Sequence, residues 1–222
     1  MSTLVVYPDP NVEVTSVDGY AQRQVAGDSW SDLHNGAGTS ASDLASFGVA
    51  ISIAADATAY LTLRRPFFLF DTSSIGSGQA VSACTLQIWC SGHVDNDDYT
   101  PTYNVYSSSP ASNTAIVSSD YANVGTTAYA SDVTQSTISS IEPGYATWTF
   151  TATGIAAIAM TGISKFCLRN NYDATNTDPG KGGRNGTCNI TIRWAEQAGT
   201  DNDPVLTVTY APPGSSRFFL VT

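Results

Sequence analysis

The chain has 222 residues, of which 13% are charged, and its 19 acidic against 9 basic residues give a formal net charge of -10. A chain of this length can bury a full hydrophobic core as one large β domain. Its negative charge repels phosphate groups, so we expect neither nucleic acid nor an anionic membrane surface as a partner.

Membrane insertion and export are not expected from the sequence either. No window approaches the roughly 20 apolar residues of a membrane helix. The first residues lack the cationic and apolar regions of a signal peptide. We therefore expect no membrane insertion and no signal peptide in this chain.

The first part of the chain predicts short strands separated by turns. Residues 4–7 form an apolar run, and Val12 and Val14 are expected to continue in extended form. Asp28 is placed to cap a single helical turn that ends at Gly36. Alternating apolar residues predict two further strands, at 49–53 and at 60–63.

The stretch 64–90 is expected to organise the fold. Phe67 and Leu69 point to one face of a strand, and Phe68 and Phe70 point to the other, so both faces are expected to be covered. Pro66 has no N–H to donate to a neighbouring strand, so it predicts the start of the strand or a bulge.

Residues 81–90 predict a second, half-buried strand. Its apolar face carries Cys84, Leu86, Ile88 and Cys90, and Trp89 points outward. An acidic loop is predicted at 91–99, a strand at 102–106, and an ordered loop with short strands at 107–140.

The last part of the chain contains the strongest helix candidate, which is about two turns over residues 153–160 ending at Gly162. The remaining predicted strands are 146–150, 165–169, 188–194 and 205–210.

This pattern of about ten short strands favours an all-β fold. We predict an antiparallel two-sheet β-sandwich of jelly-roll type with one or two short helical turns. Residues 1–210 are expected to form this single domain. Residues 211–222 are expected to form a proline-containing spacer and an apolar C-terminal tail.

Disulfides are not favoured by the cysteine positions. Cys84 and Cys90 belong to one predicted strand and are about 20 Å apart at its usual rise, too far for a disulfide. Cys167 and Cys188 could pair, but buried thiols that pack as small apolar residues are the favoured interpretation.

Acidic loops raise the possibility of a structural calcium ion, which prefers carboxylate and amide oxygens. The loops are 95–98, 173–178 and 201–203. Turn formation by Asp and Asn is the alternative explanation. The candidate ligands are Asp95, Asp97, Asp98, Asp201 and Asp203.

Motifs for catalysis are weak. His34 and His93 are the two histidines and lie in separate predicted loops, with no serine elbow or H-E-x-x-H helix beside them. The glycine-rich segment 180–187 lacks the residue order of a phosphate loop and leads into a strand. We therefore predict no catalytic residue.

Eleven tyrosines and four tryptophans allow a carbohydrate-binding role. Exposed aromatic rings form apolar platforms for sugar faces, and nearby Asp and Asn bind hydroxyl groups. Tyr99, Tyr103 and Tyr172 are the candidates, and packing in the core is the alternative for each.

The C-terminal tail has the apolar character of a strand. Left alone in water, its residues would promote aggregation, so we expect it either to return to its own sandwich or to pair with a neighbouring copy. The proline-proline spacer favours the second arrangement. The expected assembly residues are Arg217, Phe218, Phe219, Leu220 and Val221.

Two segments carry a family resemblance. Residues 65–86 (RPFFLFDTSSIGSGQAVSACTL) and 203–210 (DPVLTVTY) resemble DNRLRE-type β-sandwich domains, whose strands typically contain F-D-x-S-S-I, x-x-A-T-L and P-x-L-x-V-x-Y. The hexapeptide that names the family is absent. Residues 7–10 and 16–19 also resemble the start of proteins encoded by tailed-phage and environmental viral genomes. The resemblance implies a jelly-roll fold in a virion or extracellular context, and relatives include polysaccharide-binding modules.

Together these features predict a non-enzymatic structural or surface protein of a phage-like virion or filament, such as a decoration, fibre or coat component. Its expected partners are copies of itself and other particle proteins. The alternative is a carbohydrate-binding module with a glycan as its ligand.

Overall fold

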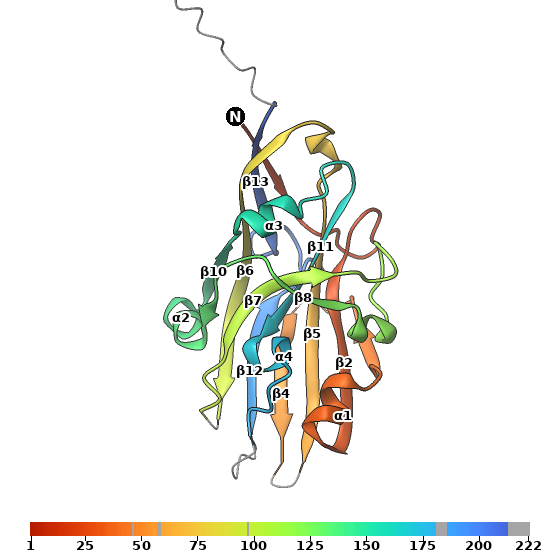
Figure 1. Ribbon diagram of the computed structural model, residues 1–222, viewed down its shortest axis with the longest axis vertical. Coiled ribbons are helices and arrows are strands. Elements are labelled where there is room, and N and C mark those ends of the chain that lie inside the picture. The colour runs from red at the N-terminus through yellow and green to blue at the C-terminus, as the bar shows by residue number, and fades with distance from the viewer. Residues whose placement is uncertain (46, 57–58, 97, 181–185, 213–222) are drawn as a thin grey trace, which may run out of the picture.

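The computed structural model describes residues 1–45, 47–56, 59–96, 98–180 and 186–212 (Figure 1). Their strands pair in antiparallel fashion throughout. The all-β, antiparallel prediction is confirmed, and jelly-roll connectivity stays a prediction. The strands are β1 (Ser2–Val6), β2 (Asp18–Asp28), β3 (Ser40–Ser42), β4 (Phe47–Ala55), β5 (Tyr60–Asp71), β6 (Ala80–Asp95), β7 (Thr102–Ser108), β8 (Val124–Ala128), β9 (Val133–Thr134), β10 (Gly144–Thr149), β11 (Ile163–Asn170), β12 (Thr187–Arg193) and β13 (Val205–Ala211).

Helices are short and lie in the connections. The sequence predicts one or two helical turns, whereas the described residues contain four α-helices and two 3-10 helices. They are α1 (Trp30–Asn35), α2 (Gln135–Ile141), α3 (Ala152–Ala156), α4 (Asn171–Ala174), η1 (Ser73–Ile75) and η2 (Ser118–Ala122). Among the described residues, no helix is long and apolar enough to cross a membrane.

The sheet folds back on itself around a first hydrophobic cluster. Hydrogen bonds join the strands in the order β1-β13-β6-β12-β4-β5-β11-β7-β8. Although β6 and β7 are far apart in this order, Leu86 of β6 and Val105 of β7 belong to the same buried cluster. Trp148 of β10 and Phe166 of β11 complete its aromatic centre. This arrangement is a β-sandwich, with apolar side chains between two facing parts of the sheet.

A second hydrophobic cluster lies on the other face of β5. Phe68 and Phe70 belong to the first cluster, Phe67 and Leu69 belong to the second, and all four are 0% exposed. The prediction that this strand is covered on both faces is therefore confirmed. Helix α1 covers part of the second cluster with Trp30 and Leu33.

The strand β5 is longer than predicted. Residues 60–63 and 67–71, which were expected to belong to separate strands, form one continuous element. On one edge it pairs with β4 as far as Arg64 and with β11 from Phe67 onward. Pro66 lies where this edge changes partner, a position that tolerates a residue without an N–H.

Strand β6 is also longer than the predicted strand 81–90. Its residues 90–95 pair with β12, so the start of the predicted acidic loop belongs to the sheet. Strand β2 was not predicted, since its sequence is polar and lacks clear alternation. Its pairing with β5 stabilises it. Val12 and Val14, expected to be extended, belong to no strand and are 83% and 79% exposed.

Helix limits differ from prediction at their ends. Ser29, not Asp28, caps α1, and its hydroxyl accepts a hydrogen bond from Asp32 N at 3.1 Å. Helix α3 has five residues, fewer than the two turns expected over 153–160. Helix α2 was not predicted, because its sequence is rich in Ser and Thr, which are weak helix formers.

The four cysteines are buried thiols, as favoured by the sequence. Burial raises the pKa of Cys84, Cys90 and Cys167 to about 12. The expected assembly residues, Arg217, Phe218, Phe219, Leu220 and Val221, lie outside the described residues.

Candidate functional site

A cavity of about 420 Å³, which we call the polar cavity, lies beside the end of β6. Strand β6 places His93 and Asp95 on one face, because residues two apart in a strand share a face. The opposite wall comes from the start of α2, where Gln135, Ser136 and Ser139 line the cavity. The site therefore combines one long strand with one short helix.

Asp95 shapes the loop at the mouth of the polar cavity. Its Oδ1 accepts a hydrogen bond from Tyr99 N and its Oδ2 accepts one from Thr100 N, both at 2.8 Å. Asp98 and Thr100 have positive φ angles of 52° and 45°, which this turn requires. Both oxygens of Asp95 are thus used in turn formation, the alternative that the sequence left open.

Gln135 gives the polar cavity its hydrogen-bonding capacity. The side chain is 7% exposed, and its Oε1 accepts a hydrogen bond from the Tyr103 hydroxyl at 2.5 Å. Its Nε2 has no hydrogen-bond partner among the described residues. A buried amide donor without a partner costs free energy.

His93 adds a second polar group to the wall. Its Nδ1 lies 2.8 Å from Glu142 Oε1, and the other oxygen of Glu142 has no partner in the part of the chain that the structure describes. The cavity therefore presents hydrogen-bonding groups around a space large enough for a small polar molecule.

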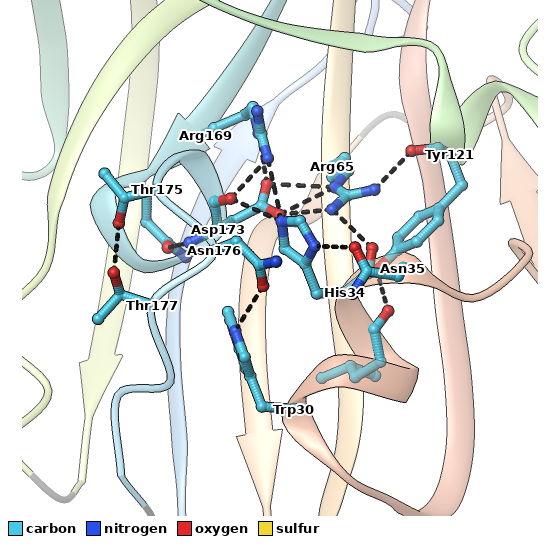
Figure 2. A network of polar contacts seen from close by, with 12 residues as sticks. Trp30, His34, Asn35, Arg65, Tyr121, Arg169, Asp173, Thr175, Asn176 and Thr177 are labelled. Atoms are coloured by element: carbon cyan, nitrogen blue, oxygen red, sulfur yellow. Dashed lines mark hydrogen bonds and ion pairs between the residues drawn. The ribbon is translucent and has the colours of Figure 1, made fainter.

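A second polar site surrounds Asp173, which is held between two arginines (Figure 2). Arg65 Nη2 donates to Asp173 Oδ1 at 2.6 Å, and Arg169 Nε donates to Asp173 Oδ2 at 2.7 Å. The three side chains are at most 3% exposed. Burial would raise the pKa of Asp173, but the two arginines outweigh it and lower the pKa. We call Arg65, Arg169 and Asp173 the cation centre.

The cation centre joins segments that are distant in the sequence. Arg65 also donates to the carbonyl oxygens of Tyr121 at 2.6 Å and His34 at 3.1 Å. Arg169 donates to the carbonyl oxygen of Gly125 at 2.8 Å. Hydrogen bonds from these arginines thereby join β5 to α1 and η2, and β11 to β8.

Sequence reasoning missed the cation centre. The four-residue spacing of Arg169 and Asp173 was the available local signal, and such pairs are common on protein surfaces. Arg65 is 108 residues from Asp173 in the sequence, so no local pattern connects them.

A third site gathers carboxyl groups, namely Asp18, Glu196 and Asp203, which we call the acidic centre. Asp18 is 0% exposed, and its Oδ2 accepts a hydrogen bond from Ala195 N at 3.2 Å. Burial, and then the charge of Glu196, raise the pKa of Asp18 well above its ordinary value. Among the described residues, neither carboxylate oxygen of Glu196 has a hydrogen-bond partner.

The other two carboxyl groups of the acidic centre are also shifted. Burial raises the pKa of Glu196 from 4.5 to about 7, with further contributions from Glu13 and Asp43. Burial raises the pKa of Asp203 from 3.8 to about 6; a hydrogen bond from Gln197 offsets part of this effect. The site therefore holds protons more tightly than ordinary carboxyl groups do.

The predicted calcium ligands do not come together. Asp95 and Asp98 line the polar cavity, whereas Asp203 lies near Tyr145, which pairs with Trp89 of β6. Asp95 lies six residues farther along β6 than Trp89, which is a distance of about 20 Å at the rise of a strand.

The other two candidate ligands add no support for one calcium site. Asp201 is exposed beside Asp203, and Asp97 is outside the described residues. Among the described residues, no group of three or more His, Cys, Asp or Glu side chains is arranged to hold a metal ion. Calcium binding stays a prediction, which a lower melting temperature after chelation would support and an unchanged one would dismiss.

The proposed tyrosine platform is wrong for its main candidates. Tyr99 and Tyr103 are 0% and 1% exposed, because their rings pack in the two hydrophobic clusters. Tyr172 is half-buried against the second cluster, and its hydroxyl donates to the carbonyl oxygen of Tyr99 at 2.6 Å. These rings support the core and the loop beside the polar cavity.

Comparison with models of known protein families finds no match, and comparison with curated protein sequences finds none either.

Proposed function

We propose that this chain is a non-enzymatic structural or surface protein of a phage-like virion or filament, which associates with copies of itself through a sheet edge and its C-terminal tail. The resemblance of residues 65–86 and 203–210 to DNRLRE-type domains is consistent with this role. The observation that carries the proposal is the position of β1.

Strand β1 ends the hydrogen-bonded order of the sheet. Among the described residues it pairs with β13 alone, so its other edge keeps backbone N–H and C=O groups available. Val5 on this strand is 49% exposed. An exposed edge of this kind is a template for a strand from another molecule.

The end of β13 lies one strand away from this edge. The register pairs Ser2 with Tyr210, so the start of β1 and the end of β13 are at the same end of the molecule (Figure 1). A segment leaving β13 after Ala211 therefore starts one strand away from the available edge. This proximity supports association through both elements together.

The test compares the molecular mass in solution of the full chain and of a chain that ends at Pro212. We expect the full chain to associate and the shortened chain to remain folded and monomeric by light scattering. An unchanged mass after truncation would remove the tail from the proposal.

A matched pair of substitutions tests the edge strand. Val5→Lys places a charge on β1 and should weaken association, since lysine on an edge opposes strand pairing. Val14→Lys is the control, because Val14 is 79% exposed and lies outside the strands. Equal association of both variants would argue against the edge.

A second candidate function, glycan binding, is favoured by the polar side chains that line the polar cavity, among them His93, Asp95 and Ser139. Sugar hydroxyls both donate and accept hydrogen bonds, which suits a wall made of amide, hydroxyl and carboxylate groups. The cavity, not the buried tyrosines, is the proposed contact surface.

A glycan array with the full chain tests this candidate. Ser139→Trp should fill the cavity and abolish binding, whereas Ser140→Trp, on an exposed residue that does not line the cavity, should leave binding unchanged. A blank array with the unmodified chain would reject glycan binding.

A further inference from the structure

The cation centre carries more positive than negative charge. Arg65 and Arg169 are each 3% exposed, and Asp173 supplies one carboxylate between them. Arg23, the next arginine along this side, is paired with Asp28 at 2.6 Å. A buried charge without a counter-charge is costly, so an additional anion would stabilise this site.

The nearest other buried carboxylate does not supply that charge. Asp120 precedes Tyr121, but its oxygens accept hydrogen bonds from its own loop. The donors are Ala111 N and Val117 N, both at 3.0 Å, and Asn123 Nδ2 at 2.9 Å. Asp120 therefore serves to order the segment before β8.

Both arginines keep a donor that the described residues do not use. An arginine has five N–H groups, of which each Nη atom carries two. Arg65 Nη1 donates to Tyr121 O alone, and Arg169 Nη1 donates to Gly125 O alone. One N–H on each Nη1 thus remains without an acceptor among the described residues.

These two arginines also line a cavity of about 230 Å³. Its other walls are the end of α1, with His34 and Asn35, and strand β8, with Val124 and Thr126. The two carbonyl oxygens that bind the Nη1 atoms belong to residues on either side of Ala122–Val124, so the remaining donors lie close to this wall. The volume is below the roughly 300–1,000 Å³ typical of sites for larger ligands, and so it suits a small ion or group.

We propose that this cavity is a binding site for a small oxyanion, a carboxylate, sulfate or phosphate group, held by Arg65 and Arg169. Guanidinium groups match oxyanions in geometry, because two N–H donors can meet two oxygens. The ion balances the excess charge of the cation centre and links α1 to β8. The chain is otherwise strongly acidic, with a net charge of -10, so this site is a local exception.

The experiment measures the melting temperature of the full chain at pH 7 as sulfate, phosphate or acetate is added in the low millimolar range. Sodium chloride keeps the ionic strength constant and serves as the reference anion. At least one oxyanion should give a saturable rise of about 2–4 °C over chloride, and the ranking of the three separates tetrahedral ions from carboxylates. Equal curves for all four anions would overturn the proposal.

Substitutions at β8 locate the effect. Thr126 is exposed and lines the cavity, so Thr126→Glu places a tethered carboxylate at the site. This variant should melt higher than the unmodified chain in chloride and should lose the response to the oxyanion. Thr126→Gln, which has the same shape without the charge, should keep the response.

Thr127→Glu is the matched control for added charge. Thr127 is also exposed, but it points to the other face of β8, because side chains alternate along a strand. Its response to the oxyanion should equal that of the unmodified chain. A full response in Thr126→Glu, or its loss in Thr127→Glu, would show that the ion binds elsewhere and would overturn the assignment.

Discussion

Two buried charged sites of opposite character lie on the two faces of β5. In the cation centre, arginines keep Asp173 ionised by lowering its pKa. In the acidic centre, Asp18, Glu196 and Asp203 have few compensating partners, and burial raises their pKa values. Burial raises the pKa of every carboxyl group, so the charged and hydrogen-bonding neighbours decide whether the ionised or the protonated form is stable.

The sheet keeps these two sites apart. Arg65 shares its face of β5 with Phe67 and Leu69, which belong to the second hydrophobic cluster. Asp18 pairs directly with Phe68, whose ring belongs to the first cluster, and directly paired residues share a face. The arginines therefore cannot neutralise the acidic centre, although both sites contact the same strand.

The largest expected effect is that of Asp173→Asn. This change removes the carboxylate between two buried guanidinium groups, so we expect the free energy of unfolding to fall by about 3–5 kcal/mol. Urea unfolding followed by tryptophan fluorescence measures it. Asp201→Asn, at an exposed position, is the control and should change stability by less than about 0.5 kcal/mol. A loss as small as the control's would mean that the cation centre is not important for stability.

The same substitution in the acidic centre should have the opposite sign. Asp18→Asn removes a carboxyl group whose ionised form is disfavoured, while its amide oxygen can still accept the hydrogen bond from Ala195 N. At pH 7.5 we expect the free energy of unfolding to increase by about 1 kcal/mol, a usual size for a stabilising substitution. A decrease comparable to that of Asp173→Asn would contradict the comparison between the two sites.

Stability should also depend on pH in a way that identifies the acidic centre. Glu196 and Asp203 have pKa values of about 7 and about 6 in the folded chain, above their ordinary 4.5 and 3.8. At a pH between the ordinary and the raised pKa of each group, the folded chain binds more protons than the unfolded chain. These two groups therefore make the free energy of unfolding rise as pH falls from 7.5 to 5. Their contribution is lost as pH rises through 6 to 7.

Below about pH 4 the cation centre reverses this trend. Because the pKa of Asp173 is lowered in the folded chain, its contribution to the free energy of unfolding is fully present above its ordinary pKa of 3.8. This contribution is lost at lower pH as the carboxyl group takes up a proton. Glu196→Gln should flatten the profile between pH 5 and 7.5 and leave the acid limb unchanged, which urea unfolding at a series of pH values would measure. A profile that Glu196→Gln does not alter would assign the dependence to other groups.

Much of the fold could be predicted because strand patterns are local. The alternation in 67–70 and 81–90 predicted the faces of β5 and β6, and both predictions are confirmed by the burial of these residues. Strand β2 and helix α2 could not be predicted in this way. Their sequences are polar, and pairing or packing with distant residues stabilises them.

The candidate sites were predictable only in part. Asp95 and Asp98 were identified as polar loop residues, and they do line a cavity, but the partner wall at Gln135 lies 40 residues farther along the chain. Asp203 was grouped with Asp201 by proximity in sequence, and the structure adds Asp18 and Glu196 as electrostatic neighbours. The tyrosines were chosen by composition, which does not distinguish a buried ring from an exposed one.

The sequence by itself determined which residues alternate and where turns interrupt them, and it favoured cysteines that pack as buried thiols. The tertiary structure alone decided which charges meet: Arg65 with Asp173, and Asp18 with Glu196 and Asp203. The physical reason is the distance in sequence over which each effect acts. Alternation and turn formation depend on residues a few positions apart, whereas the pKa of a buried group depends on charges that strand pairing brings to it from elsewhere in the chain.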